Sequence, residues 1–551
     1  MVVAVLSSDL DADAGAVLDR LFDLQKSIVQ PADLDDWLHQ LSQLEREVQT
    51  LWISHVLAVK RNANDAYAKS RYKRLVEYWI PQLEAQIDVL HDAASAWDLA
   101  QSHPKVAAYF KSDQAQSQSQ QQLSLQAQER TLITEYDTIV SNRVVHLESG
   151  DITVQEALSI ISSTTERQKR EAIWQLIKTS ELQVAPKLDA LFAQLLELRR
   201  KLAMASDSTN YVEYVWKNSN RSYNPDEAVQ FLTIIADVFA DLTAHLDQAR
   251  ADALGVERLK PWDLNVRLAA PSSTVLSEDE YIAISKQVIQ EIDSEFGAVV
   301  DKLLQEGRFD LSPRLGKMNG NAAFLHKALN TTEIVCNLTG AFDNLSGLLH
   351  ELGHAIHWHF LTPNNFSWDL HGDKEVNEFF AFAFQFLGYE IIVRNTTFLQ
   401  SDREFYRRSI LEYALARLES VNERLRMELW LYSQTGDITP LQIDQHYLEL
   451  YHRASVDWSE NMDYISKQWQ HKQLFVQSFY NIEYSISTIA ALIFLDTYHK
   501  NPAQATKNLK AGMEVGFTQG FKSIFEVMGI QFPFSRDQIV AAKNVLLGWL
   551  D

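Results

Sequence analysis

Residues 347–357 read Gly-Leu-Leu-His-Glu-Leu-Gly-His-Ala-Ile-His. In a helix, the side chains of His350 and His354 lie about 40° apart around the axis, so both imidazoles can reach one cation. Glu351 projects roughly 100° from His350, where it can touch a water molecule bound to that cation. Two histidines and a glutamate at this spacing are typical of zinc hydrolases. A chain of this composition would contain the pattern by accident about 0.06 times, so a third ligand must support the interpretation.

The composition predicts a large, mainly α-helical protein. The chain has 551 residues, 46% of them hydrophobic, which is enough for a large core or for two lobes that face each other across a cleft. Only 18 Gly and 12 Pro are present, which leaves few turn-forming residues for a sheet-rich fold. We expect an N-terminal helical region over residues 1–180 and a region containing the metal motif over residues 181–551, packed as one compact unit.

Charge and cysteine content limit the partners and the compartment. The formal net charge of −23 and the pI near 5.1 disfavour binding to nucleic acid or to an anionic membrane surface. The single cysteine, Cys336, excludes an internal disulfide and suits a reducing compartment. No basic, apolar signal sequence precedes Arg20, and no later segment approaches the ~18 uncharged apolar residues needed to span a bilayer. We therefore expect a cytoplasmic protein that binds neither nucleic acid nor membrane. No sequence feature indicates an oligomeric state.

Most of the chain has helical periodicity. Apolar residues recur at helical spacing from about residue 16 to residue 102. Further helices are predicted over residues 131–146, 154–177, 186–204 and 463–498. Residues 112–128 are rich in Gln and Ser, a composition found both in disordered segments and on polar helix surfaces, and we expect an ordered helical tip there.

Extended structure is predicted only where residues 322–329 and 332–338 flank a turn near Asn330. This strand pair leads directly into the helix that carries His350. A strand edge beside a metal-binding helix could hold an extended peptide by main-chain hydrogen bonds. A purely structural hairpin explains the same residues equally well.

Several residues after the motif could complete the metal site. The candidates are His357, His371, Glu375 and Glu378. His357 lies ~10 Å along the helix from His350, too far to share one ion unless the helix breaks. Glu375 and Glu378 begin a segment that continues with apolar residues on nearly every side, so we expect this segment to be buried. A buried carboxylate needs a partner such as a zinc ion. One of these acids can bind the metal while the other accepts the free N–H of a ligating histidine, since they are three residues apart on one helix.

The motif, the sequence Glu375-Val376-Asn377-Glu378 and the Phe/Ala run after it resemble the thimet oligopeptidase and oligoendopeptidase F family of zinc peptidases. In that family an acid precedes the ligand glutamate by three residues, which implies Glu378 as the third ligand of one Zn²⁺ and Glu375 as the residue that supports a ligating histidine. The resemblance covers roughly residue 180 to the C-terminus. Further matches are Gly316-Lys317, residues 337–343, Trp469-Gln470, residues 479–484 and, more loosely, residues 195–214. It implies an almost wholly helical ellipsoid with a deep channel that excludes folded proteins and admits short peptides.

Two positions depart from the family. It normally has a histidine where this chain has Gln473, and a second consecutive tyrosine where this chain has Asn481. Those residues help to hold substrate and to stabilise the tetrahedral intermediate, so the departures concern rate and specificity. His471 could replace the missing histidine only if the backbone shifts, because a two-residue move swings a helical side chain by about 200°. Tyr480 and Tyr484 are retained.

The resemblance implies hydrolysis of internal peptide bonds in short, unstructured peptides. The ligands His350, His354 and Glu378 would hold the zinc ion, and Glu351 would pass a proton from water to the leaving amine. Tyr484, with Tyr480 as second choice, would donate a hydrogen bond to the developing oxyanion.

Two other functions fit the same residues. A weakly active or inactive peptide-binding relative that keeps the zinc site would explain Gln473 and Asn481. A zinc hydrolase for a different class of substrate would keep the metal and cleave no peptide.

Overall fold

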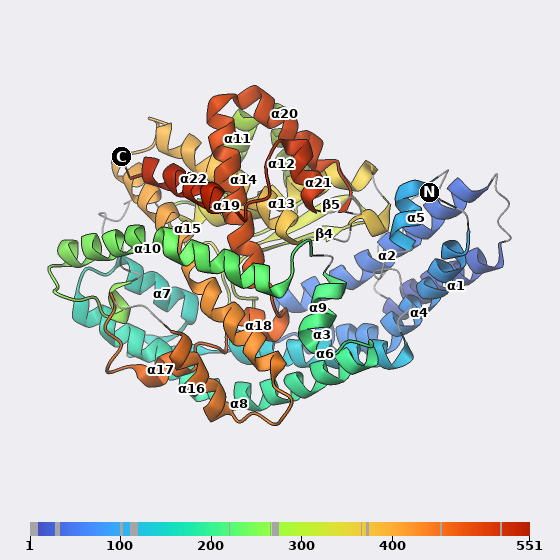
Figure 1. The fold of residues 1–551 in the computed structure, drawn as a ribbon, viewed down its shortest axis with the longest axis horizontal. Helices are drawn as coiled ribbons and strands as arrows, with labels where there is room; N and C mark the ends of the chain where they lie inside the picture. The colour runs from blue at the N-terminus through green and yellow to red at the C-terminus, as the bar shows by residue number, and fades with distance from the viewer. Residues whose placement is uncertain are drawn as a thin grey trace.

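Helices form most of the described chain, which confirms the predicted mainly α class (Figure 1). The computed structural model describes residues 9–27, 33–97, 99, 103–110, 119–219, 221–264, 266, 275–364, 366–370, 374–451, 455–517 and 521–550. In Figure 1 the N-terminal helices lie to the right, helix α8 lies at the bottom, and the metal-motif helix α13 lies in the upper half beside strands β4 and β5.

The N-terminal helices pack around their own apolar cluster. Helix α1 begins after Asp9, whose carboxylate accepts hydrogen bonds from the amides of Asp11 and Ala12. In α2, the apolar stripe that includes Trp37 and Leu41 is buried against α1 and α4. The elements are α1 Leu10–Lys26, α2 Leu34–Arg61, α3 Ala66–Arg74, the π-helical turn η1 Leu75–Trp79, α4 Ile80–Ser95 and α5 Pro104–Phe110.

The segment after residue 118 differs from the prediction at several helix ends. Residues 112–118 of the Gln/Ser tract lie outside the described residues, but a capping box at Ser119 starts helix α6, Gln120–Ser141. The helix predicted over residues 131–146 is wrong at its end, where strands β1 Val144–Leu147 and β2 Gly150–Thr153 form an antiparallel hairpin around a positive-φ glycine.

The next helical stretch also divides differently from the prediction. The predicted helix 154–177 breaks after Ser163, and α8 then runs without interruption from Arg167 to Ala205. Pro186, expected at a helix start, lies inside α8, because tertiary packing overrides its local preference. Since α8 crosses residue 180, the predicted boundary between regions falls within one helix, and the division itself stays a prediction.

A three-stranded sheet lies beside α13. Strands β3 Phe309–Asp310, β4 Ala322–His326 and β5 Thr331–Val335 have the order β3-β5-β4, and β4 pairs antiparallel to β5 as predicted. Strand β4 is therefore an edge strand. The side-chain amide of Gln49 in α2 pairs with this strand like a neighbouring strand, donating to the Leu325 carbonyl (2.9 Å) and accepting from the Lys327 amide (3.1 Å).

Helices α13 Asn344–Asn364, α14 Lys374–Arg394 and α19 Asn481–Lys500 form the centre of the largest core. Gly353 in the metal motif allows α13 and α14 to cross closely. A Cβ at this position would lie 2.7 Å from the Ala381 Cα and 3.1 Å from the Phe380 carbonyl oxygen. The distance between the motif and α14 is therefore set by backbone contact.

By length and mean hydropathy, two of the described helices are apolar enough to cross a membrane, contrary to the expectation from the sequence. They are α14 and α10, Pro225–Leu254. Within the fold, 83% of the apolar window of α14 is buried, against 33% for α10. The burial of α14 is that of a core helix.

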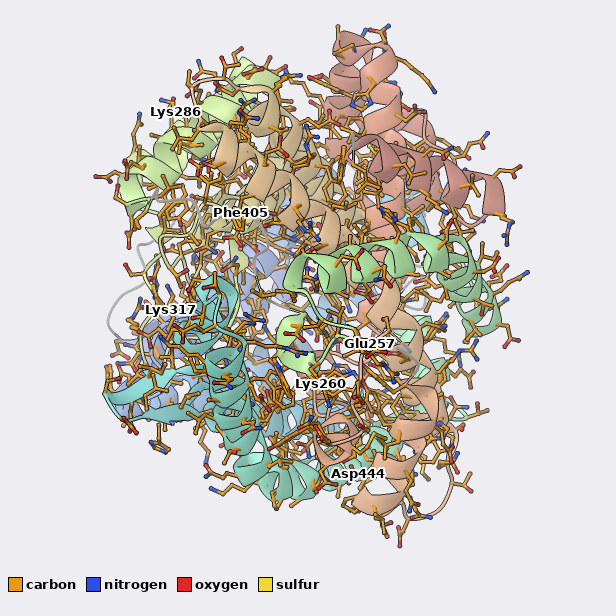
Figure 2. All side chains as sticks on the ribbon, turned by 90° about the vertical axis from the view of Figure 1, so that its left-hand side faces the viewer. Glu257, Lys260, Lys286, Lys317, Phe405 and Asp444 are labelled. Carbon is orange, nitrogen blue, oxygen red and sulfur yellow. The ribbon has the colours of Figure 1, made fainter. Side chains whose placement is uncertain are left out.

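The remaining elements complete both halves of the molecule. Helix α15 begins near Phe405 in the upper half, and Asp444 of the following helix α16 lies in the lower half (Figure 2). The helix predicted over 463–498 is wrong, because that segment divides into three helices. The bounds are α7 Val154–Ser163, α9 Tyr211–Asn218, η3 Pro261–Asp263, α11 Glu278–Ile292, α12 Ser294–Gln305, η4 Ser367–Leu370, α15 Gln400–Ser433, α16 Pro440–Leu450, α17 Met462–Ser466, α18 Lys472–Val476, α20 Pro502–Met513, α21 Phe521–Met528 and α22 Arg536–Gly548.

Candidate metal centre

Three side chains from the two crossing helices converge on one point. The Nε2 atom of His350 lies 3.3 Å from Glu378 Oε2, and the Nε2 atom of His354 lies 3.8 Å from Glu378 Oε1. One donor atom from each residue lies within 4.8 Å of the other two, and all three side chains are buried. The close crossing at Gly353 brings Glu378 to this position.

These donors fit a zinc ion. Glu378 Oε2 is buried and accepts no well-aligned hydrogen bond within the described residues, although His350 Nε2 is close. This is the geometry of atoms that face a common centre rather than each other. Two imidazoles and one carboxylate also match the chemistry of a catalytic zinc site with an open position.

The protonation states respond to burial and to the mutual contact of the donors. Burial alone would lower the pKa of His350, but the Glu378 carboxylate outweighs it and raises that pKa to about 9. Burial would raise the pKa of Glu378, but its contact with His350 lowers it to about 2. Burial lowers the pKa of His354 to about 4. His350 and Glu378 therefore each favour the charged form of the other.

Glu351 lies on α13 beside the edge strand. The residue is 6% exposed, and burial raises its pKa to about 7, while His350, the Lys472 cation and the Ala323 amide favour the charged form. A carboxylate with a pKa near neutrality can both accept and release a proton.

Glu375 is not in contact with a ligating histidine. The Nδ1 atom of His350 instead faces the side-chain oxygen of Gln385 at 3.1 Å, and Gln385 donates to Ser346. Glu375 accepts from the Tyr223 hydroxyl, and its carboxylate lies 3.8 Å from the Arg221 guanidinium. The support expected of Glu375 is thus given to His350 by Gln385, because Glu375 points toward the segment that precedes α10.

His357, another candidate ligand, does not join the donors. The His357 ring packs against Phe380, with 4.1 Å between ring centroids, and burial lowers its pKa. His371 lies outside the described residues.

The two tyrosines occupy different positions. The Tyr480 hydroxyl donates to Glu378 Oε1. The Tyr484 ring lies 5.0 Å from that of Tyr480 and contacts Arg417, but its hydroxyl makes no hydrogen bond within the described part of the chain. The Glu378 carboxylate and burial both raise the pKa of Tyr484, so its hydroxyl stays protonated.

Tyr480 is positioned by a strained turn between α18 and α19. Phe479 has a φ of 63°, which costs a non-glycine residue about 1–2 kcal/mol. Its amide donates to the buried carboxylate of Glu428, and its carbonyl accepts from Arg221 at 2.7 Å. Arg221 also donates to Glu483 at 2.7 Å. Buried ionic groups therefore hold both sides of the strained peptide.

The three remaining predicted residues lie near this turn. Asn481 is buried and accepts from Arg424 at 3.3 Å. His471 caps α18, accepting from the Leu474 amide at 3.4 Å, and Gln473 lies beside it. Within the described residues, no hydrogen bond or ion pair joins His471, Gln473 or Asn481 to the three metal donors.

Sequence reasoning missed Gln385, Tyr413 and Arg417. Arg417 lies over the rings of both Tyr413 and Tyr484, and Tyr413 influences His350 electrostatically. Gln385 was visible as a polar residue in an apolar helix, seven residues after Glu378. Tyr413 and Arg417 lie in an ordinary amphipathic helix and carry no comparable signal.

Comparisons with known proteins bear on the family of this chain. The model of Peptidase family M3 matches residues 160–543. No curated protein sequence matches. The fold is similar to PZ peptidase A, with TM-score 0.86 and 19% identity over 98% of this chain and 96% of the other.

Two further solved structures are similar in fold. A protein assigned as an oligoendopeptidase F from Bacillus anthracis has TM-score 0.82 and 17% identity, with coverage of 98% and 94%. The oligoendopeptidase-F of Enterococcus faecium has TM-score 0.66 and 14% identity, with coverage of 98% of both chains. Because the family model covers well over half of a chain that carries the family's motif on crossing helices, this protein belongs to peptidase family M3.

Proposed function

We propose that this M3 peptidase is a zinc-dependent oligoendopeptidase that cleaves internal bonds of short, unstructured peptides in the cytoplasm. The observation that carries the proposal is the convergence of His350, His354 and Glu378 beside the buried carboxyl group of Glu351. All four residues are at most 8% exposed, which favours a flexible peptide that can enter over a folded protein that cannot.

Different residues of the chain have different roles in the proposed reaction. A bound zinc ion would acidify a water molecule and polarise the scissile carbonyl. Glu351 accepts the proton of that water and returns it to the leaving amine, for which a pKa near 7 is suitable. The Tyr484 hydroxyl makes no hydrogen bond within the described residues and is the first candidate to donate to the developing oxyanion. Tyr480 is the second candidate, since its hydroxyl is engaged by Glu378.

The test combines metal content with turnover. Zinc is measured in the purified protein, and cleavage of a quenched peptide is followed with and without a chelator. Glu351→Gln should retain stoichiometric zinc and lose most of the turnover, whereas Glu378→Gln should lose both. Circular dichroism checks that each variant is folded.

The outcomes separate the alternatives. Chelator-sensitive cleavage supports the peptidase. Peptide affinity without turnover, unaffected by chelator, would favour the peptide-binding relative. Stoichiometric zinc with neither cleavage nor peptide binding would favour a hydrolase for another substrate class.

A further inference from the structure

One buried arginine outside the metal donors joins α14 to the turn before α19. Arg221 lies on the segment between α9 and α10, and its side chain is 1% exposed. Its Nη2 atom donates to the Phe479 carbonyl and to Glu483 Oε1, each at 2.7 Å. Its Nε atom lies 3.8 Å from Glu375 Oε1. The guanidinium is therefore in contact with both the first turn of α14 and the segment that carries the candidate catalytic tyrosines.

Two rings of the same segment enclose this guanidinium. Its central carbon lies 4.4 Å from the ring centroid of Trp216 and 5.8 Å from that of Tyr223. A planar guanidinium can stack on such rings and donate through a rigid fork at the same time, whereas a lysine ammonium is a compact point charge. We therefore expect that lysine at position 221 would keep the positive charge and lose the geometry.

The carbonyl that Arg221 holds belongs to the strained residue Phe479. A non-glycine residue with a φ of 63° keeps this conformation only when its surroundings impose it. The Phe479 amide donates to Glu428, so both main-chain polar groups of this residue have buried partners. The hydroxyl of the next residue, Tyr480, donates to Glu378 Oε1. The direction in which the Tyr480 side chain leaves the main chain thus depends on the conformation of Phe479.

Further contacts hold the first turn of α14 independently of this conformation. The Tyr223 hydroxyl donates to Glu375, which precedes Glu378 by three residues and lies on the same face of the helix. Ser487 of α19 donates to the Glu375 carbonyl at 2.7 Å. The turn before α19 could therefore relax while Glu378 stays in place.

We propose that Arg221 is a positioning residue of the metal centre, which holds Phe479 in the left-handed conformation that places the Tyr480 hydroxyl on Glu378. Within the described residues, Arg221 makes no hydrogen bond or ion pair with a metal donor, so its effect must pass through Tyr480. The proposal rests on the proposed function, because it assigns to Arg221 a part in holding a zinc ligand.

The first test measures the zinc Kd of Arg221→Lys by competition with a chelator. Loss of a group that orients a metal ligand typically weakens metal binding 10- to 100-fold. Lysine retains one donor near the Phe479 carbonyl, so we expect a rise at the lower end of this range, about tenfold.

The matched control is Arg170→Lys. The Arg170 side chain is also 1% exposed, and it donates to Asp263 at 3.0 Å and to the Thr165 carbonyl at 2.8 Å. Both variants lose a buried arginine, so both should unfold at a lower urea concentration, but only Arg221→Lys should weaken zinc binding. A zinc Kd that is unchanged in Arg221→Lys, or raised equally in both variants, would overturn the proposal.

A double-mutant cycle tests whether the effect passes through the Tyr480 hydroxyl. Tyr480→Phe already lacks the hydrogen bond to Glu378, so adding Arg221→Lys should raise the zinc Kd by less than about twofold more. An arginine with a merely structural role would weaken zinc binding by the same factor in both backgrounds, and such additivity would overturn the proposal.

A second variant covers the case in which Arg221→Lys does not fold. Arg221→Met combined with Glu483→Gln removes the ion pair without leaving either of its charges buried alone, a replacement that proteins often tolerate. It also removes the donor to the Phe479 carbonyl, so the zinc Kd should rise 10- to 100-fold, as in Tyr480→Phe. A folded double variant that binds zinc like the wild type would overturn the proposal.

Cleavage of a quenched peptide separates the positioning role from the peptidase function. If no peptide is cleaved but the zinc Kd values show the expected coupling between Arg221 and Tyr480, the positioning role stands and the peptidase proposal fails. If the wild type cleaves peptides in a chelator-sensitive reaction but Arg221→Lys binds zinc normally, the peptidase proposal stands and the positioning role fails.

Discussion

Removing the Tyr480 hydroxyl tests how Glu378 is held. In Tyr480→Phe, Glu378 Oε1 loses the hydrogen bond donated by the phenol, while the ring can remain in place. Loss of a partner that orients a metal ligand typically weakens metal binding 10- to 100-fold, or about 1.4–2.7 kcal/mol. That hydrogen bond also helps to keep the pKa of Glu378 low. We therefore expect the zinc Kd of Tyr480→Phe to rise 10- to 100-fold, with the larger effect at the lower pH.

Competition with a chromogenic chelator at fixed pH measures this Kd, and circular dichroism confirms that the variant is folded. Tyr484→Phe is the matched control, because the Tyr484 hydroxyl has no hydrogen bond within the described residues. It should bind zinc like the wild type and lose about 10²- to 10³-fold in kcat, as expected for an oxyanion donor. If Tyr480→Phe binds zinc normally and loses only kcat, the assignment of Tyr480 to ligand support is refuted.

Three further measurements follow from the structure. Gly353→Ala should lower the free energy of unfolding and weaken zinc binding, because the new Cβ meets the Ala381 backbone and such overpacking costs about 1–3 kcal/mol. The control is Gly15→Ala, whose Cβ would have ordinary contacts. In urea unfolding, this control should raise the free energy of unfolding by up to about 1 kcal/mol. Zinc affinity should rise about tenfold per pH unit between pH 6.5 and 8.5, because the pKa of His350 is about 9 and zinc must displace the proton of this residue. A zinc Kd that does not change with pH would contradict this. Burial lowers the pKa of Lys327 to about 7, so between pH 7 and pH 9 the unfolded chain binds more protons than the folded chain. The free energy of unfolding of the wild type should therefore rise by up to about 1.4 kcal/mol per pH unit over this range. Urea unfolding at pH 7 and at pH 9 should show no such rise in Lys327→Met.

The metal donors could be predicted because their signal is local. Helical periodicity fixes where His350, Glu351 and His354 point, and the resemblance selected Glu378 over Glu375. The sequence also showed a glycine at position 353, but only the structure shows that its missing Cβ brings Glu378 to the histidines. Gln385 and Tyr413 come from other turns or other helices, so no spacing rule connects them to His350.

The segment from residue 463 to residue 498 shows why the rest could not be predicted. Its apolar periodicity predicts one helix, yet the chain breaks twice and Phe479 adopts a left-handed conformation. That conformation is stabilised by Glu428 and Arg221, which lie far away in the sequence. Local propensity opposes the turn, and tertiary contacts impose it, so the position of Tyr480 is a property of the whole fold.

The pairing of Gln49 with strand β4 also bears on solubility. A strand edge that is open enough to hold a peptide would equally well template pairing with a strand of another protein molecule, the first step of aggregation. Here the Gln49 amide occupies the Leu325 and Lys327 end of that edge with a side chain that cannot propagate a sheet. We therefore expect that the first effect of losing this amide is self-association at high protein concentration.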